Sequence, residues 1–282
     1  MKAMFRMIVI AAAFALAGIY LFVSAPPELP DGAVAGATIP AESALAMLDA
    51  ESAVIRALYT REIVGEGGRQ GLAFREDWRK DGVAAGPLPA LLLRETSQRL
   101  QVQVPELGLF LGSDFPLVKA NLFTGVQATH YAEVKKTLQP KFYYDAALKR
   151  TTAMFADRAA APACVQCHNE HPASPKRDWV LNEAMGATTW SYAGRQVSSE
   201  TMLRMLAALR GSAVAAYGAY LQKVAAFEPQ ARPAVGDKWP REGFYLPDQD
   251  TFRKSLEAQN SAATLDRLIV AIGKASSAGA KP

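Results

Sequence analysis

The sequence feature that most constrains this chain is the pentapeptide Cys164-Val165-Gln166-Cys167-His168, which contains both of its cysteines. Two cysteines are too few for a disulfide-stapled scaffold, and they exclude a zinc site built from two Cys-x-x-Cys pairs. Cys-x-x-Cys-His is the attachment sequence for c-type haem: both thiols form thioethers with the vinyl groups, and the adjacent imidazole binds the iron. The pentapeptide therefore predicts one covalent haem c, attached at Cys164 and Cys167, with His168 as the proximal iron ligand.

The competing interpretation of the same residues is a thioredoxin-like dithiol. That motif opens a helix after a strand in a βαβ unit. Here the pentapeptide is preceded by Ala-Ala-Ala-Pro at 159–162 and followed by Asn-Glu-His-Pro at 169–172. This setting favours haem attachment over dithiol chemistry.

The N-terminus indicates export. Lys2 and Arg6 precede an uncharged, mostly apolar stretch at 7–23, which resembles the basic and hydrophobic regions of a signal sequence. A membrane span needs about 20 apolar residues, so both a cleaved signal peptide and a retained signal anchor fit residues 1–25. Pro26 is a poor first residue after a cleavage site, which favours the anchor. Either way the rest of the chain is expected in the periplasm, anchored in the inner membrane or secreted.

Composition and periodicity predict a folded α+β protein. Half of the residues are hydrophobic, and the formal charge of +4 comes without a basic run, so no nucleic-acid partner is expected. After a Pro/Gly/Ala linker at 26–40, helices are expected at 41–64 and 90–100, and strands at 107–111, 142–148, 152–156 and 187–193. Residues 41–195 are the predicted haem domain. Residues 196–282 are a predicted helical C-terminal extension, in which Met202, Leu206, Leu209, Ala213, Ala216 and Tyr220 form an apolar face. This face favours packing within the chain over dimerisation.

The segment from Cys164 to Trp179, followed by Gly186-Ala187, resembles the haem-binding segment of the Tll0287-like (DUF3365) family. Further similar pieces are 58–64, 86–90 and 113–116, so the resemblance covers about residues 45–195. It implies a PAS-like antiparallel sheet flanked by helices, with haem at its edge, used for redox or small-ligand sensing. Family members often have a cytoplasmic output domain. The sequence shows no second span and no such domain, which gives weight to an electron-carrier role.

The sixth iron ligand would decide the function, and the sequence leaves it open. The distal candidates are His130, Met47 and Met154; an open site would instead bind a diatomic gas. His171 is expected in a turn or in contact with a haem propionate. Further candidates for propionate contacts are Tyr59, Arg61, Arg158, Lys176 and Arg177, and candidates for the haem wall are Trp179, Trp190 and Tyr192.

These features predict an extracytoplasmic monohaem c-type cytochrome that senses redox state or a diatomic ligand and passes the signal to a protein partner. The alternative is a one-electron carrier between periplasmic or membrane redox partners. The enzymatic alternative, a peroxidase, would need a distal acid-base group, for which His130 is the candidate. The sensor and carrier functions are both non-enzymatic, and they are favoured.

Overall fold

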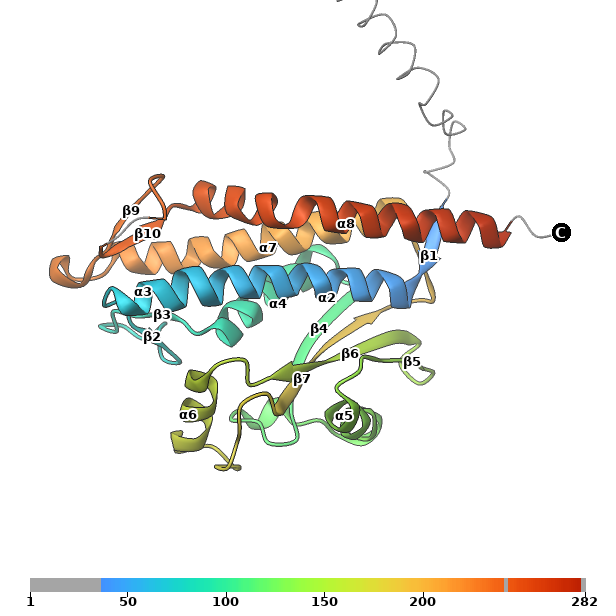
Figure 1. Ribbon diagram of the computed structural model, residues 1–282, viewed down its shortest axis with the longest axis horizontal. Coiled ribbons are helices and arrows are strands. Elements are labelled where there is room, and N and C mark those ends of the chain that lie inside the picture. Colours follow the sequence, from blue (N-terminus) through green and yellow to red (C-terminus); the bar gives the residue numbers. More distant parts are fainter. Residues whose placement is uncertain (1–36, 241–242, 280–282) are drawn as a thin grey trace, which may run out of the picture. The chain divides into compact units, whose positions relative to one another are not determined.

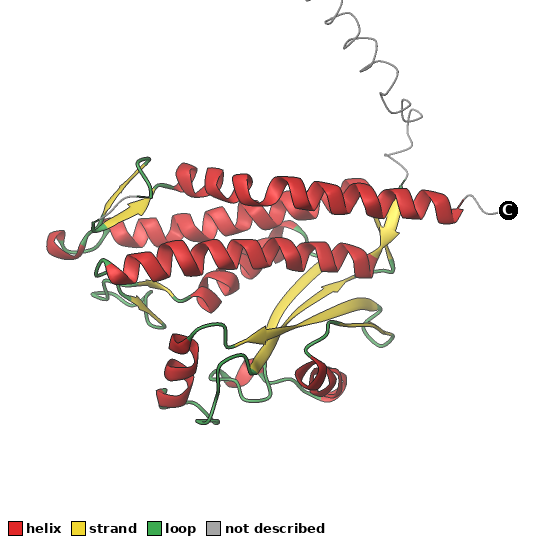
Figure 2. Cartoon of the chain, viewed as in Figure 1, coloured by secondary structure: helices red, strands yellow, loops and turns green. Residues whose placement is uncertain are grey.

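A four-stranded antiparallel sheet and a layer of long helices form the core of the structure (Figures 1 and 2). The structure is a computed structural model, and it describes residues 37–240 and 243–279. Helices account for 52% of the residues and strands for 21%, which confirms the α+β class. Within the described residues no helix has the length and apolar character needed to cross a membrane. The signal or anchor segment expected at 1–25 lies outside the described residues.

The sheet has the strand order β4-β7-β6-β5. Its strands are β4 (Leu107–Gly112), β5 (Lys141–Asp145), β6 (Arg150–Arg158) and β7 (Ala184–Tyr192). Each neighbouring pair is antiparallel, and the register places Ala153 of β6 and Leu109 of β4 on either side of Trp190 in β7. The four predicted strands are thus confirmed, with ends that differ by a few residues.

The two faces of the sheet pack against different helices, because side chains alternate along each strand. On one face, Met154 and Ala187 form a small apolar cluster with Tyr131 and Val134 of α5 (Gly125–Thr137). On the other face, the larger core includes α2 (Ala41–Leu58) and α4 (Pro89–Gln103). The segment that contains Cys164, Cys167 and His168 follows β6 along the chain, so its start is fixed by the last strand residues of this sheet.

The helix predicted at 41–64 begins as expected but changes character near its end. After α2 the chain continues without a break as a π-helical segment, η1 (Tyr59–Gly65), and then as α3 (Glu66–Arg69). Single π-turns inserted in helices are frequent at functional sites. Here the segment forms one wall of a cavity described below.

Two C-terminal helices, α7 (Ser199–Ala225) and α8 (Gln249–Gly279), pack beside α2 (Figure 1). The hydroxyl of Ser198 accepts a hydrogen bond from the backbone N–H of Thr201 at 3.1 Å, which caps α7. All six residues of the predicted apolar face of α7 are buried in the core shared with α2 and α4. Packing within the chain is therefore confirmed for this face.

The remaining elements are short. They are β1 (Thr38–Pro40) paired with β8 (Gln196–Ser198), β2 (Phe74–Arg75) with β3 (Gly86–Pro87), β9 (Ala234–Gly236) with β10 (Tyr245–Pro247), α6 (Pro162–Glu170), and the turns η2 (Lys119–Asn121) and η3 (Pro229–Ala231). β1 occupies the end of the stretch expected to be a linker at 26–40. The sequence did not predict α5 or α6, and α6 contains the pentapeptide.

Candidate haem-attachment site

Helix α6 places the three chemically important side chains of the pentapeptide on neighbouring turns. Pro162 is at its first turn, where the missing N–H costs no hydrogen bond. Cys164, Cys167 and His168 stand at positions i, i+3 and i+4, which share one side of a helix. Both thiols are free; Cys167 is exposed and Cys164 half-buried. The site therefore offers two accessible sulfurs and an imidazole on one surface.

His168 is half-buried against the residues that follow the helix. Its ring meets the edge of Trp179 at 6.5 Å between centroids and 88° between planes. Asn169 fixes the backbone of that tryptophan, because its side-chain amide donates to the Trp179 carbonyl at 3.0 Å and its side-chain oxygen accepts from the Trp179 backbone N–H at 2.8 Å. The imidazole therefore packs against Trp179, and two hydrogen bonds hold the backbone of Trp179 in place.

The environment of His168 keeps its ring neutral. Burial lowers the pKa of His168 below its usual value, and His171 adds to this effect, while Glu76 opposes it. The Nδ1 atom is buried and has no hydrogen-bond partner among the described residues. A neutral imidazole is the form that binds metals, so the protonation state suits an iron ligand.

His171 connects the end of α6 to a distant loop. Its Nε2 lies 3.1 Å from Oε2 of Glu76, in the segment after β2, and its Nδ1 accepts from the backbone N–H of Ala173 at 3.1 Å. The turn predicted for His171 is present, and its ring contacts a carboxylate.

An ion pair from α2 lies on the other side of the motif. The guanidinium of Arg56 donates to Asp157 at 2.6 Å and to Thr188 at 3.1 Å, and Thr188 donates to the second oxygen of Asp157 at 2.8 Å. Asp157 raises the pKa of Arg56, and Cys164 makes a smaller contribution in the same direction. The charge of Arg56 therefore interacts electrostatically with Cys164 of the pentapeptide.

A half-buried carboxyl group on the same helix lies within electrostatic reach of this ion pair. Asp49 accepts a hydrogen bond from Nε1 of Trp190 at 3.1 Å. Burial is the main cause that raises the pKa of Asp49 to about 6, and the nearby charge of Asp157 raises it further. The helix therefore contains one group that titrates close to neutral pH.

The three distal candidates lie in other parts of the protein. Met47 is buried among the helices, on the side of α2 that faces α8, and Met154 lies in the cluster under α5. The ring of His130, on α5, packs on Tyr143 with 4.0 Å between centroids. Within the described residues, none of the three shares a core cluster, hydrogen bond or ring contact with His168.

Of the other residues predicted to surround the haem, some lie near His168 and others do not. Trp179 does contact His168, whereas Trp190 lies in the core on the α2 face of the sheet. Tyr59 is fully buried, and its hydroxyl donates to the Pro87 carbonyl at 2.6 Å rather than pointing to the surface where a haem propionate would lie. The charged candidates have partners: Arg61 contacts Glu62, Arg158 contacts Asn182, Lys176 contacts Asp178 and Glu183, and Arg177 contacts the Pro172 carbonyl.

The residues present fit a covalently attached haem. The two thiols are unpaired and accessible, and among the described residues the imidazole has a buried nitrogen without a partner. The setting differs from that of a dithiol enzyme, because β6 and β7 on either side of α6 are antiparallel neighbours rather than strands of a parallel βαβ unit. The donor set and the local topology both favour the haem interpretation.

Sequence reasoning missed Arg56, Asp157, Thr188 and Glu76 as neighbours of the motif. One signal was available: Asp49 and Arg56 are seven residues apart, so they share a face of the helix that was predicted to pack in the core. Two charged groups on such a face indicate a polar network. No family model matches the sequence, and the comparisons with curated proteins and with solved structures also find no match.

Proposed function

We propose that the protein is an extracytoplasmic monohaem c-type cytochrome that senses redox state or a diatomic ligand. Cys164 and Cys167 hold the haem, and His168 is the proximal ligand. The observation that supports this most directly is the placement of two free thiols and a half-buried imidazole on one side of α6. Bound haem supplies an iron that changes oxidation state or accepts a diatomic ligand.

The proposal includes the PAS-like character and the family resemblance. An antiparallel four-stranded sheet with helices on both faces is compatible with such a domain, and α6 lies directly after the strand β6. Because c-type haem is attached outside the cytoplasm, the proposal also places residues from about 26 onward in the periplasm. The chain is retained there by an N-terminal anchor or released by cleavage.

Contacts on two sides of α6 favour sensing. Asp157 precedes the motif and pairs with Arg56 of α2, while His171 follows the motif and contacts Glu76. A shift of α6 would therefore act on both a long helix and a distant loop. Since α2 packs with α7 and α8, the helical layer is a route for the signal toward a protein partner.

The alternative, a one-electron carrier, is favoured by the exposure of the motif. α6 has no buried residue, so a haem attached there would lie near the surface, where a redox partner could approach. This function would need no movement of α6. The two functions thus differ in whether the state of the iron alters the structure.

The test is expression of the full chain in a bacterial host that attaches c-type haem. The purified protein should be red, and its haem should resist extraction by acidified acetone because thioether bonds hold it. A Cys164→Ala, Cys167→Ala double variant should lose the covalent pigment. Colourless wild-type protein, or pigment released by the acid, would overturn the proposal.

The spectrum of the ferrous protein separates the two functions. A shift of the Soret band on addition of CO would show that the sixth position opens and would favour sensing. An unchanged spectrum, combined with rapid reduction by a small cytochrome, would favour the carrier.

A further inference from the structure

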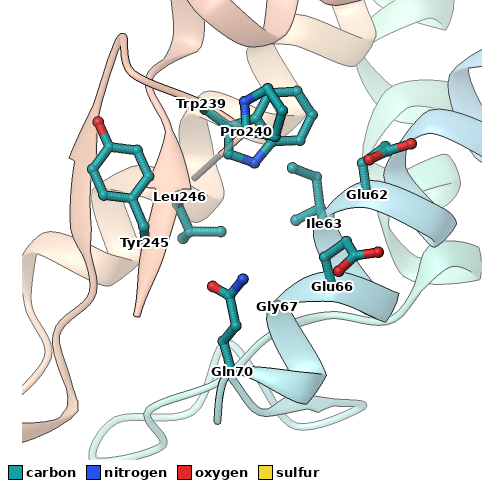
Figure 3. Close-up of a pocket in the computed structure, with 9 residues that line it drawn as sticks. All are labelled: Glu62, Ile63, Glu66, Gly67, Gln70, Trp239, Pro240, Tyr245 and Leu246. Carbon is teal, nitrogen blue, oxygen red and sulfur yellow. The ribbon is translucent and has the colours of Figure 1, made fainter. Parts of the chain in front are cut away.

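A cavity of about 300 Å³ lies at one end of the helical layer, away from the haem motif in sequence. The π-helical segment and α3 form one wall, and the segment around β10 forms the other (Figure 3). The lining residues used below are Glu62, Ile63, Glu66, Gln70, Trp239 and Tyr245. The volume is at the lower end of the range for small-molecule sites.

The cavity has an acidic wall. Glu62 and Glu66 are four residues apart on successive helical turns, and both line the space. Their arginine partners point outward: Arg61 pairs with Glu62 and is 62% exposed, and Arg69 pairs with Glu66 and is 70% exposed. Exposed ion pairs of this kind are weak and screened by water, so the carboxylates remain attractive to a cation inside the cavity.

The opposite wall is aromatic and apolar. Figure 3 shows Trp239 across from Glu62 and Glu66, with the amide of Gln70 directed toward the space between them, whereas the ring of Tyr245 extends away from the two carboxylates. Indole and phenol faces attract organic cations, and the attraction is strongest for tryptophan. Ile63 adds an apolar surface for alkyl groups. Carboxylates facing aromatic rings favour a ligand with a positive charge and a hydrocarbon surface.

Other ligand classes fit this lining poorly. Two carboxylates repel an anion. A calcium ion takes six to eight oxygen ligands, and among the described residues no group of three or more His, Cys, Asp or Glu side chains is arranged to hold a metal ion. A neutral apolar molecule would gain nothing from the two carboxylates, which would keep only their exposed arginine partners.

We propose that this cavity binds a small organic ammonium ion, with its charge between Glu62 and Glu66 and its alkyl groups against Trp239 and Ile63. This site is separate from the haem motif and does not depend on the function proposed for it. The quaternary ammonium of choline and the primary ammonium of butylamine are suitable probes of this chemistry.

Titration calorimetry of the full chain with choline and butylammonium tests the proposal. The matched control ligand is 3,3-dimethylbutan-1-ol, which has the shape of choline without its charge. At least one ammonium probe should bind about ten-fold more tightly than the alcohol, because only a cation uses the carboxylates and the aromatic faces. Absence of binding by both ammonium probes at about ten-millimolar concentration, or equal binding of the alcohol, would overturn it.

Substitutions locate the binding in this cavity. Glu62→Gln with Glu66→Gln should weaken binding about ten-fold, and Trp239→Leu should weaken it several-fold. Glu133→Gln, at an exposed carboxylate on α5, should leave the affinity unchanged. Circular dichroism establishes that each variant is folded. If the double variant is folded and binds as tightly as the wild type, the ligand lies elsewhere and the proposal is wrong.

Discussion

Arg56 and Asp157 form an ion pair across 101 residues of sequence, with 2.6 Å between Nη1 and Oδ1. The pair joins the last turn of α2 to the end of β6, five residues before α6 begins at Pro162. The two side chains are 35% and 22% exposed, so the contact is only partly screened by water. It is the closest described link between the helical layer and the strand that leads into the haem motif.

Replacing Arg56 by leucine should lower the free energy of unfolding by about 1–2 kcal/mol, because a part-buried Asp157 then lacks its charged partner. Arg56→Lys should recover part of this loss, since lysine keeps the charge but cannot bond both Asp157 and Thr188 in the same geometry. Urea unfolding followed by circular dichroism measures the difference.

An exposed arginine provides the control for Arg56. Arg253, on α8, is 44% exposed and pairs with Asp250 and Glu257. Arg253→Leu should change the free energy of unfolding much less than Arg56→Leu does, because water screens an exposed ion pair. Equal effects at the two positions would show that the Arg56 pair has no special structural weight.

The raised pKa of Asp49 predicts a specific pH dependence of stability. The folded chain holds the Asp49 proton up to about pH 6, whereas the unfolded chain releases it near the ordinary aspartate pKa of 3.8. Between these values the folded state binds more protons, so the free energy of unfolding falls as the pH rises from about 4 to 6. The total loss is on the order of 3 kcal/mol, and it persists at neutral pH.

Asp49→Asn should remove this loss, since the neutral amide can still accept the hydrogen bond from Trp190. The variant should match the wild type in stability near pH 4 and exceed it by about 2–3 kcal/mol at pH 7–8. Asp178 is 86% exposed and its pKa is lowered by Lys176, so Asp178→Asn should produce no such gain. A variant at position 49 that is less stable than the wild type at pH 8 would contradict the assigned protonation.

The helices that the sequence predicted are those with a periodic buried face. The apolar positions of α7, from Met202 to Tyr220, follow helical spacing and are all buried. In α5 only Tyr131 and Val134 are buried, and in α6 none is, so neither helix has an apolar period that could be read. A helix on the surface is fixed by contacts with the sheet and by local turn chemistry, which a pattern of hydrophobic residues does not contain.

The candidate site divides in the same way. Cys164, Cys167 and His168 are adjacent in the sequence, so their chemistry could be inferred from spacing alone. Arg56 and Asp157, by contrast, meet only because α2 packs on the sheet, and the contact of Glu76 with His171 spans 95 residues. Such contacts depend on the tertiary structure.

The buried face of α7 predicts a large loss of stability on truncation. Leu209 is fully buried, and Leu209→Ala should cost about 2–5 kcal/mol through lost burial and a new cavity. Leu203, on the same helix, is 51% exposed, and Leu203→Ala should cost less than about 0.5 kcal/mol. If this face instead mediated dimerisation, Leu209→Ala would change the oligomeric state in size-exclusion chromatography more than it changed the unfolding of the monomer.

The positions of the distal candidates predict which substitutions alter the spectrum of the haem-loaded protein. Met47 and Met154 pack in separate apolar clusters and His130 packs on Tyr143, so Met47→Leu, Met154→Leu and His130→Gln should each leave the Soret and α bands unchanged. His168→Ala should shift the Soret and α bands while the haem stays covalently attached to Cys164 and Cys167, because the thioethers do not depend on the iron ligand. Absorption spectra of the ferrous variants test all four substitutions under one condition. A change of these bands in one of the first three variants would identify that side chain as the distal ligand, and it would require that the loaded protein bring that side chain to the iron.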